Sequence, residues 1–301
     1  MKKLIVIGGA TATGKTALAI RVAQWLNTEI LSADSRQFYR EMNIGTAKPS
    51  LSELALVPHH FINSHTISEN YSVGAFEKEA LELLELRFKQ YDHIVLTGGS
   101  GLYIQAVCEG FDQFPDVSHN IKSQVEAGIR TGGIEWLQQT LEQLDPQYFS
   151  KVDRQNPARL IRAVEVSMEA GKPYSTFLNQ VEKRPRFFES VYLLLDLPRP
   201  LLYERIDKRV DEMIIAGLEE EARSLIPYRN HPALKTVGYE EFFDYFDGKM
   251  SLDHTIEKIK QHSRNYAKRQ VTWFNKHGNW NRFLPDEWGK IQSFLTEKLL
   301  V

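Results

Sequence analysis

The stretch that decides the fold is GGATATGKTALA, residues 8–19, which follows the apolar run LIVI at residues 4–7. A short apolar run before a glycine-rich turn is typical of a buried strand, and the helix-forming sequence KTALAIRVAQWL begins at residue 15. Gly9 to Thr16 match the phosphate-binding pattern G-x-x-x-x-G-K-[ST] in the strand–turn–helix context that the pattern requires. We therefore expect an α/β fold with an anion site near the amino end of the chain.

The residues of this phosphate loop indicate how an anion would be held. Its glycines let the backbone turn N–H groups inward, and the positive end of the following helix points at the same place. Lys15 adds a full charge, and Thr16 offers a hydroxyl to Mg²⁺, so Thr16 is the predicted metal ligand. The predicted diphosphate- or nucleotide-binding residues here are Gly9, Ala10, Thr11, Ala12, Thr13, Gly14, Lys15 and Thr16.

Three further apolar runs predict strands of a parallel sheet covered on both faces, at residues 29–34, 93–99 and 191–197. A helical pattern at residues 73–90 separates two of them. Strand-like runs are absent between residues 112 and 190, where polar helical patterns replace them. We expect a first part of the core at 1–112, a helical insertion at 113–190, and a second part of the core at 191–301 with basic helices.

Bulk composition excludes several classes of protein. The chain has 301 residues, 42% of them hydrophobic, which is enough for a sizeable core, and a net charge of −2 that names no partner. A single cysteine, Cys108, excludes an intramolecular disulfide and a cysteine zinc site, and fits a reducing compartment. No run approaches the ~20 apolar residues of a membrane span. We expect a cytoplasmic monomer with no membrane partner.

Polar residues follow two of the predicted strands. Asp34 comes directly after the second, where it could cap a helix or accept a proton from a nucleophile attacking the phosphorylated ligand. The amide of Gln37 could contact an adenine edge. The third strand ends in Thr97-Gly-Gly-Ser100 without an acid, which weakens a nucleotide-hydrolysing interpretation and favours a tight loop beside a ligand crevice.

Residues 258–282 contain seven Lys or Arg and no acid, with aromatic side chains interleaved. Basic residues neutralise RNA phosphates and aromatic rings stack on unpaired bases. The alternative is an amphipathic helix whose aromatics fill the core. We favour RNA phosphates for the charges and the core for Trp273 and Phe274.

Six motifs occur in order between residues 9 and 274: GATATGKT, ADSRQFYREMNIGTAKP, GGSGLY, NPARLIRAVEV, VGYEEF and YAKRQVTWF. Together they make the chain resemble the bacterial-type tRNA dimethylallyltransferases, the tRNA isopentenyltransferase or IPP transferase family. The resemblance implies a P-loop NTPase-like parallel sheet flanked by helices, with an all-helical insertion domain that contacts the tRNA anticodon stem-loop. It also implies Mg²⁺ as cofactor and dimethylallyl diphosphate as donor.

In that family the diphosphate lies in the phosphate loop. The N6 amine of the adenine 3′ of the anticodon, in tRNAs reading codons that begin with U, attacks the allylic carbon. The resemblance implies that Asp34 accepts the amine proton, that Lys15, Thr16 and Arg209 act with it in catalysis, and that Arg205 and Arg209 reach the diphosphate. It implies the following tRNA-binding residues: Asp34, Ser35, Arg36, Gln37, Ser100, Lys122, Ala158, Arg159, Leu160, Ile161, Arg162, Lys235, Gly238 and Tyr239.

Three other functions remain open at this point. A small-molecule P-loop kinase would need ATP and a second phosphate-accepting pocket, and it gives no role to residues 258–282. An adenylate isopentenyltransferase shares the loop and the acid but takes a free nucleotide. A non-catalytic RNA-binding module would not need Lys15, Thr16 and Asp34 intact.

Overall fold

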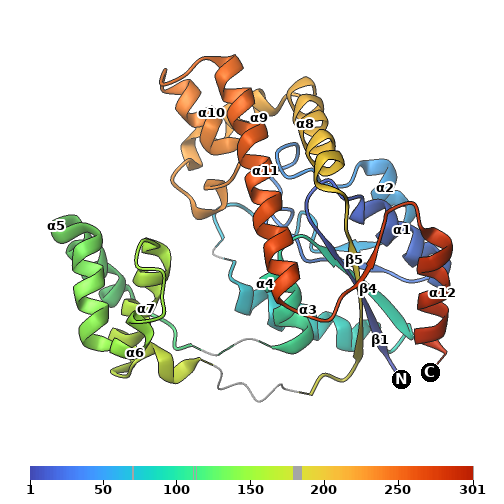
Figure 1. The fold of residues 1–301 in the computed structure, drawn as a ribbon, viewed down its shortest axis with the longest axis horizontal. Helices are drawn as coiled ribbons and strands as arrows, with labels where there is room; N and C mark the ends of the chain where they lie inside the picture. The colour runs from blue at the N-terminus through green and yellow to red at the C-terminus, as the bar shows by residue number, and fades with distance from the viewer. Residues whose placement is uncertain (70, 111, 113, 179–184, 301) are drawn as a thin grey trace. The chain divides into compact units, whose positions relative to one another are not determined.

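A six-stranded parallel sheet forms the centre of the larger of two units (Figure 1). The computed structural model describes residues 1–69, 71–110, 112, 114–178 and 185–300. Within these residues the larger unit is Met1–Cys108 with Arg186–Val301, and the smaller is Glu109–Pro185. The strands are β1 (Lys3–Gly9), β2 (Ile30–Ser32), β3 (His59–His60), β4 (His93–Gly98), β5 (Glu189–Leu195) and β6 (Asn281–Phe283), in the order β3-β2-β4-β1-β5-β6.

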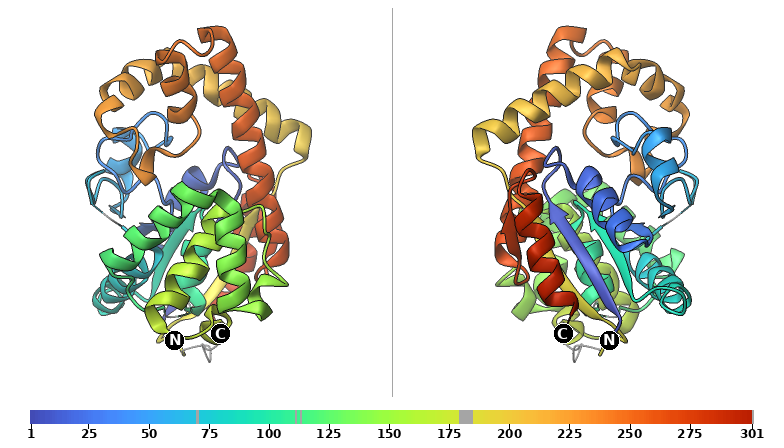
Figure 2. Two further views of the ribbon diagram at one scale, coloured as in Figure 1. Left: turned by 90° about the vertical axis from the view of Figure 1, so that its left-hand side faces the viewer. Right: turned by 90° about the vertical axis from the view of Figure 1, so that its right-hand side faces the viewer.

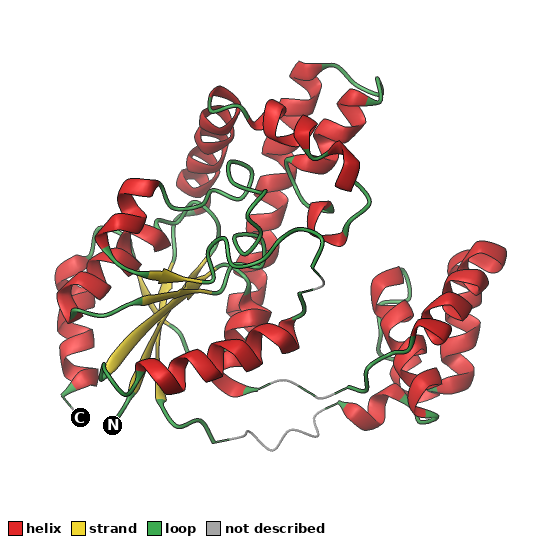
Figure 3. Cartoon of the chain, turned by 180° about the vertical axis from the view of Figure 1, so that it is seen from behind, coloured by secondary structure: helices red, strands yellow, loops and turns green. Residues whose placement is uncertain are grey.

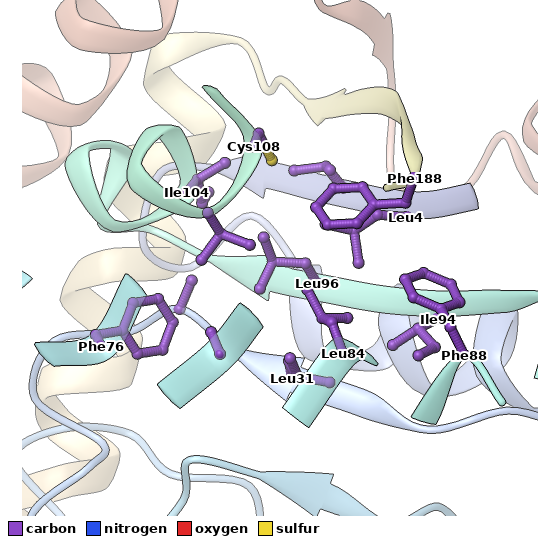
Figure 4. Close-up of a cluster of buried hydrophobic side chains, with 14 of the residues drawn as sticks. Leu4, Leu31, Phe76, Leu84, Phe88, Ile94, Leu96, Ile104, Cys108 and Phe188 are labelled. Atoms are coloured by element: carbon purple, nitrogen blue, oxygen red, sulfur yellow. The ribbon is translucent and has the colours of Figure 1, made fainter. Parts of the chain in front are cut away.

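Alternating apolar side chains of β1 divide the core into two layers. Ile5 and Ile7 pack with apolar side chains of α1 (Lys15–Leu26) and α12 (Trp288–Leu299). Figure 2 shows these two helices beside the sheet. Leu4 and Val6 face the other side, which α3 (Val73–Arg87) and α4 (Gly101–Glu109) cover. Figure 4 shows this second layer, where Leu84 and Ile104 pack close to Leu96 of β4. Burial on both faces explains why the long strands are continuous apolar runs.

The remaining helices of the larger unit lie largely beyond the carboxyl ends of the strands, and the C-terminal end of α11 (Leu252–Lys276) also packs on the sheet (Figure 1). They are α2 (Leu51–Leu56), α8 (Arg199–Ile215), α9 (Leu218–Ser224), α10 (Tyr239–Phe246) and α11. Apolar side chains of α8, α9, α10 and α11 share a separate cluster that includes Val210, Leu218, Phe242 and Ile259. Because parallel strands end at one edge of the sheet, these helices stand over the loops that follow β1, β2 and β4.

The described part of the smaller unit contains helices and loops (Figure 3). Its helices are α5 (His119–Leu144), α6 (Pro146–Phe149) and α7 (Pro157–Ala170), around a core of its own that includes Val125, Leu141, Leu160 and Val164. Local sequence sets the bounds of α7. The Asn156 side chain accepts from the Arg159 N–H, Pro157 occupies the first turn, and Gly171 ends the helix with φ +60°.

The predicted fold class is confirmed: the sheet is parallel throughout and helices flank it. Each of the four predicted strands and both predicted helices of the core is present, with ends shifted by a few residues. The sequence did not predict β3 and β6, which are two and three residues long at the two sheet edges. Within the described residues, no helix has the length and apolarity to cross a membrane.

Candidate active site

A cavity of about 160 Å³ opens beyond the carboxyl edge of the sheet. The phosphate loop, the segments after β2 and β4, and side chains of α8 and α11 line it. Among the residues singled out from sequence, those on its wall are Thr11, Lys15, Thr16, Asp34, Arg36, Gln37, Arg209 and Gly238. Residues that are far apart in the chain, from the amino-terminal loop to α8, therefore face one space.

The phosphate loop has the backbone conformation that its glycines allow. Gly14 has φ +95°, in the left-handed region, and leads directly into α1. Gly9 lies against the β5 backbone, and a Cβ there would stand 2.8 Å from the Leu195 carbonyl oxygen. The Thr13 hydroxyl and the Lys15 ammonium both donate to the Ala10 carbonyl, at 2.8 and 2.6 Å. The loop thus has an internal network that fixes the position of Lys15.

Lys15 is half-buried as a residue, and its ammonium group lies inside the site. Burial lowers its pKa to about 8; the Asp34 carboxylate acts to raise that pKa, and Arg209 lowers it further. Burial also lowers the pKa of Arg209, which Glu212 and Asp34 act to raise. The Arg209 guanidinium donates to the Thr11 hydroxyl at 3.4 Å. A polyanionic ligand would stabilise the charged forms of these two cations, which share one partly desolvated site.

Arg205 lies one helical turn before Arg209 on α8, is exposed, and is not among the residues that line the cavity. Spacing by four residues puts both arginines on similar faces of the helix. The cavity, however, contacts α8 only from Ile206 to Met213. The structure therefore brings Arg209 to the phosphate loop and leaves Arg205 outside.

Asp34 follows the last paired residues of β2 and is half-buried on the cavity wall. Its carboxylate accepts from the Arg36 N–H at 3.1 Å, so it also holds the local turn. Ser35 lies beside Ser100 of the turn after β4, whose hydroxyl oxygen accepts from the Ser35 N–H at 3.1 Å. The contact between Ser35 and Ser100 follows from the strand order, since β2 and β4 are adjacent in the sheet.

Gln37 has a different environment from the one that its sequence position suggested. Its side-chain nitrogen donates to the carbonyls of Thr46 and Ala47, each at 3.2 Å, and its oxygen accepts from Ser32. Both N–H donors of the amide are therefore used within the protein. The side chain holds the turn at residues 45–47, which lines the cavity, instead of presenting donors to a base.

Comparisons with known proteins decide which family has this arrangement. A sequence model of the family described as IPP transferase matches residues 37–277. The tRNA dimethylallyltransferase of Christiangramia forsetii is 50% identical over 297 residues, covering 98% of each chain. That of Flavobacterium johnsoniae is 46% identical, with 99% of each chain covered. The chain belongs to the IPP transferase family.

Solved structures support the same assignment. The tRNA isopentenylpyrophosphate transferase of Bacillus halodurans matches with a TM-score of 0.74 and 34% identity, over 99% of this chain and 97% of that one. A eukaryotic dimethylallyltransferase, whose structures show it acting on tRNA, matches with a TM-score of 0.81 and 26% identity, over 99% and 77% of the two chains. This member of the family therefore has the fold of tRNA prenyltransferases over nearly its whole length.

Three other predicted tRNA-binding residues of this IPP transferase lie near α10. Lys235 is exposed, and the Gly238 backbone lines the cavity. Tyr239 is completely buried, and its hydroxyl donates to Glu221 at 2.7 Å. Burial and Glu221 raise the pKa of Tyr239. The Tyr239 side chain thus packs in the core. Any contact with RNA near this position would have to come from neighbouring residues.

The remaining predicted tRNA-binding residues are in the smaller unit. Lys122 on α5 and Ala158, Arg159 and Arg162 on α7 are exposed, and Ile161 is half-buried. Leu160 has no exposed surface and belongs to the core of this unit. The helical period explains the split, because Leu160 faces inward while Arg159 and Arg162 face solvent.

The basic segment 258–282 divides between packing and solvent. Phe274 is buried, and Trp273 packs on the same core cluster, in line with the preference for core packing. Lys260, Arg264 and Arg282 pair with carboxylates of the protein, at Asp211, Asp207 and Asp196. Lys268, Arg269 and Lys276 are exposed.

Two residues important for the site's geometry were not found from sequence. Gln270 is buried on α11 and lines the cavity, and Glu221 on α9 holds the turn that follows Met42. The Glu221 carboxylate accepts from the backbone N–H groups of Asn43, Ile44 and Gly45 at 2.8–3.0 Å. A signal existed only for Gln270, a polar residue within the apolar stripe formed by Ile259, Ala267 and Phe274.

Proposed function

We propose that this chain transfers a dimethylallyl group from dimethylallyl diphosphate to N6 of the adenine 3′ of the anticodon, in tRNAs reading codons that begin with U, and releases diphosphate. The observation that carries the proposal is the single cavity shared by Lys15, Arg209 and Asp34. One end of that site suits a leaving polyanion, and the other suits an amine that must lose a proton. Family membership supports the choice of donor and acceptor.

At the donor end, the phosphate loop and two cations would hold the diphosphate. Cleavage of the allylic C–O bond places the electron pair on the diphosphate oxygen, so negative charge grows there. Lys15, Arg209 and the N–H groups around Gly14 would stabilise that charge as it forms, which their shared place at the phosphate loop supports. Removing one such donor typically costs ~2.7–4 kcal/mol of transition-state stabilisation.

At the acceptor end, Asp34 would act as general base. The N6 lone pair is delocalised into the adenine ring, so the amine is a weak nucleophile. As the N6–C bond forms, one amine proton goes to the Asp34 carboxylate, and the C–O bond to diphosphate breaks. One oxygen of Asp34 already accepts from the Arg36 N–H, which restricts the orientation of the carboxylate and supports this role.

The residues present fit a magnesium ion bound with the diphosphate. The Thr16 hydroxyl lines the cavity, and no group of three or more His, Cys, Asp or Glu ligands occurs among the described residues. Mg²⁺ usually combines one or two protein ligands with substrate phosphate oxygens and water. Thr16 would hold the ion, which supplies added charge stabilisation to the diphosphate.

The acceptor would be a whole tRNA and not a free nucleotide. Exposed basic residues occur on both units, with Lys122, Arg159 and Arg162 on the smaller and Lys268 and Arg269 on the larger. Such groups neutralise phosphates, and a free nucleotide would give them no role. An enzyme of this kind works where tRNA is, in the cytoplasm, and we expect it to act as a monomer.

Nucleoside mass spectrometry tests the proposal. The protein is incubated with Mg²⁺, dimethylallyl diphosphate and either unmodified tRNA or AMP, and the digested nucleosides are weighed. We expect a five-carbon unit on tRNA adenosine and none on AMP. Transfer to AMP would instead indicate an adenylate isopentenyltransferase, and phosphate transfer from added ATP would indicate a kinase.

A further inference from the structure

One face of α11 packs closely against residues 99–101, the turn that follows β4. A Cβ on Gly99 would stand 2.3 Å from the side-chain nitrogen of Gln270, and one on Gly101 would stand 2.1 Å from the Trp273 ring. Ser100 lies between these glycines, and its hydroxyl lies close to that of Tyr266. The three helix residues are spaced by four and by three positions, so they share one side of α11. The turn is therefore fitted to this helix.

Gln270 connects that turn to the phosphate loop. Its side-chain nitrogen donates to the Gly99 carbonyl at 2.9 Å, and its side-chain oxygen accepts from the Thr11 N–H at 2.8 Å. The residue is only 7% exposed. A buried amide with both ends bonded holds its two partners at a fixed separation, because a lost bond would leave a buried polar group unpaired.

The two ends of this bridge belong to the two halves of the site. Thr11 lies in the phosphate loop, where its hydroxyl accepts from Arg209. Gly99 precedes Ser100, whose hydroxyl contacts the Ser35 N–H beside Asp34. One amide therefore spans from the anion-binding loop to the segment that supports the carboxylate.

We infer that Gln270 is a positioning residue that sets the distance between the donor loop and the acceptor side of the site. The inference rests on the proposed function, since it assigns the two loops to the two substrates. In a displacement reaction the attacking nitrogen and the allylic carbon must meet in line. A misplacement of ~1 Å from a change away from the reacting atoms costs about 10²-fold in rate.

Gly99 gives an independent way to disturb the same bridge. Gly99→Ala drives a methyl group into the Gln270 amide, whereas the next neighbour, the Gly9 carbonyl oxygen, is 3.6 Å away. Gln270→Ala removes the bridge and also makes room for that methyl group. The rate losses caused by the two substitutions should therefore not be additive, because both act through the same contact.

The test measures single-turnover transfer to tRNA at saturating donor in Gln270→Leu, Gln270→Ala, Gly99→Ala and the Gln270→Ala/Gly99→Ala double variant. We expect each single variant to lose about 10- to 100-fold in rate, with tRNA affinity within about twofold of wild type. In the Gln270→Ala background, Gly99→Ala should cost less than about twofold. Gln261→Ala, at an exposed position of the same helix, should match wild type.

Thermal unfolding of each variant separates positioning from loss of fold, and Gln270→Leu keeps the side-chain volume if the alanine variant is unstable. Folded Gln270→Leu that transfers at the wild-type rate would overturn the inference, as would full additivity of the two alanine substitutions. A wild-type protein that modifies no tRNA would instead refute the proposed function.

Discussion

Lys15 and Asp34 face the same cavity, and the Asp34 carboxylate stabilises the charged form of the buried Lys15 ammonium. Burial acts against the charge and is the larger effect, so the pKa of Lys15 falls to about 8. Arg209 adds a second cation at the same place and disfavours the charge further. The free site thus carries a positive charge that a bound diphosphate would stabilise.

The affinity for the donor should depend on pH through Lys15. Only the charged ammonium attracts diphosphate, and a pKa of about 8 means that the charge is present below pH 8 and is lost above it. Titration calorimetry with dimethylallyl diphosphate should show affinity falling between about pH 7 and about pH 9.

Lys15→Arg provides the matched control, because a guanidinium stays charged over this range. That variant should bind more weakly at neutral pH, since Arg does not fit the Lys15 site, but its affinity should stay level as the pH rises. A wild-type affinity that is constant to about pH 9 would contradict the assignment of Lys15 to the donor.

The two arginines of α8 should behave differently. Arg209→Ala removes a half-buried cation that lines the cavity and should lower kcat/KM for the donor by about 10- to 100-fold. Arg205→Ala, at an exposed position one turn earlier, should change it by less than about twofold. Steady-state rates with varied donor make the comparison, and equal losses in the two variants would rule out the distinction.

Glu221 should matter for stability more than its partner Tyr239. Glu221→Ala leaves three backbone N–H groups and the Tyr239 hydroxyl without their acceptor, which should cost about 2–4 kcal/mol in the free energy of unfolding. Tyr239→Phe removes one of these hydrogen bonds and should cost about 1 kcal/mol. Urea unfolding measures both free energies. A Glu221→Ala protein as stable as wild type would show that the turn at residues 43–45 does not depend on Glu221.

The helical unit should contribute to tRNA affinity through its exposed basic residues. Lys122→Ala, Arg159→Ala and Arg162→Ala should each weaken tRNA binding and reduce the slope of log affinity against log salt by about one. Donor KM should stay unchanged. Filter binding at several salt concentrations supplies the slopes, and Gln139→Ala on α5, exposed and uncharged, is the control expected to match wild type.

Local sequence patterns predicted the parts of this molecule that local physics determines. The apolar runs of β1 and β4 require burial on two faces, and the glycines near Lys15 require a turn before a helix. The edge strands β3 and β6 are too short and too polar to leave such a signal, because neighbouring strands, not their own side chains, define them.

Local sequence pattern predicted the site residues that follow strand ends, and the family resemblance supplied Arg209. Asp34 and Ser100 follow strand ends, and parallel strand order brings them to one edge. Arg205, Tyr239 and Leu160 show the limit, because whether a helical residue faces a cavity, a core or solvent depends on what packs against that helix. The bridge made by Gln270 joins residues 11 and 99 through a residue late in the chain, so no local pattern contains it.

The most direct measurement of the central claim is the single-turnover rate of Asp34→Asn, with tRNA affinity measured on the same protein. Asparagine keeps the size and an oxygen that can accept from the Arg36 N–H, but it cannot take the N6 proton. We expect tRNA affinity within about twofold of wild type and a rate lower by at least about 10²-fold, in the range of general-base catalysis. A rate above about a tenth of wild type would contradict the role of Asp34 as the base.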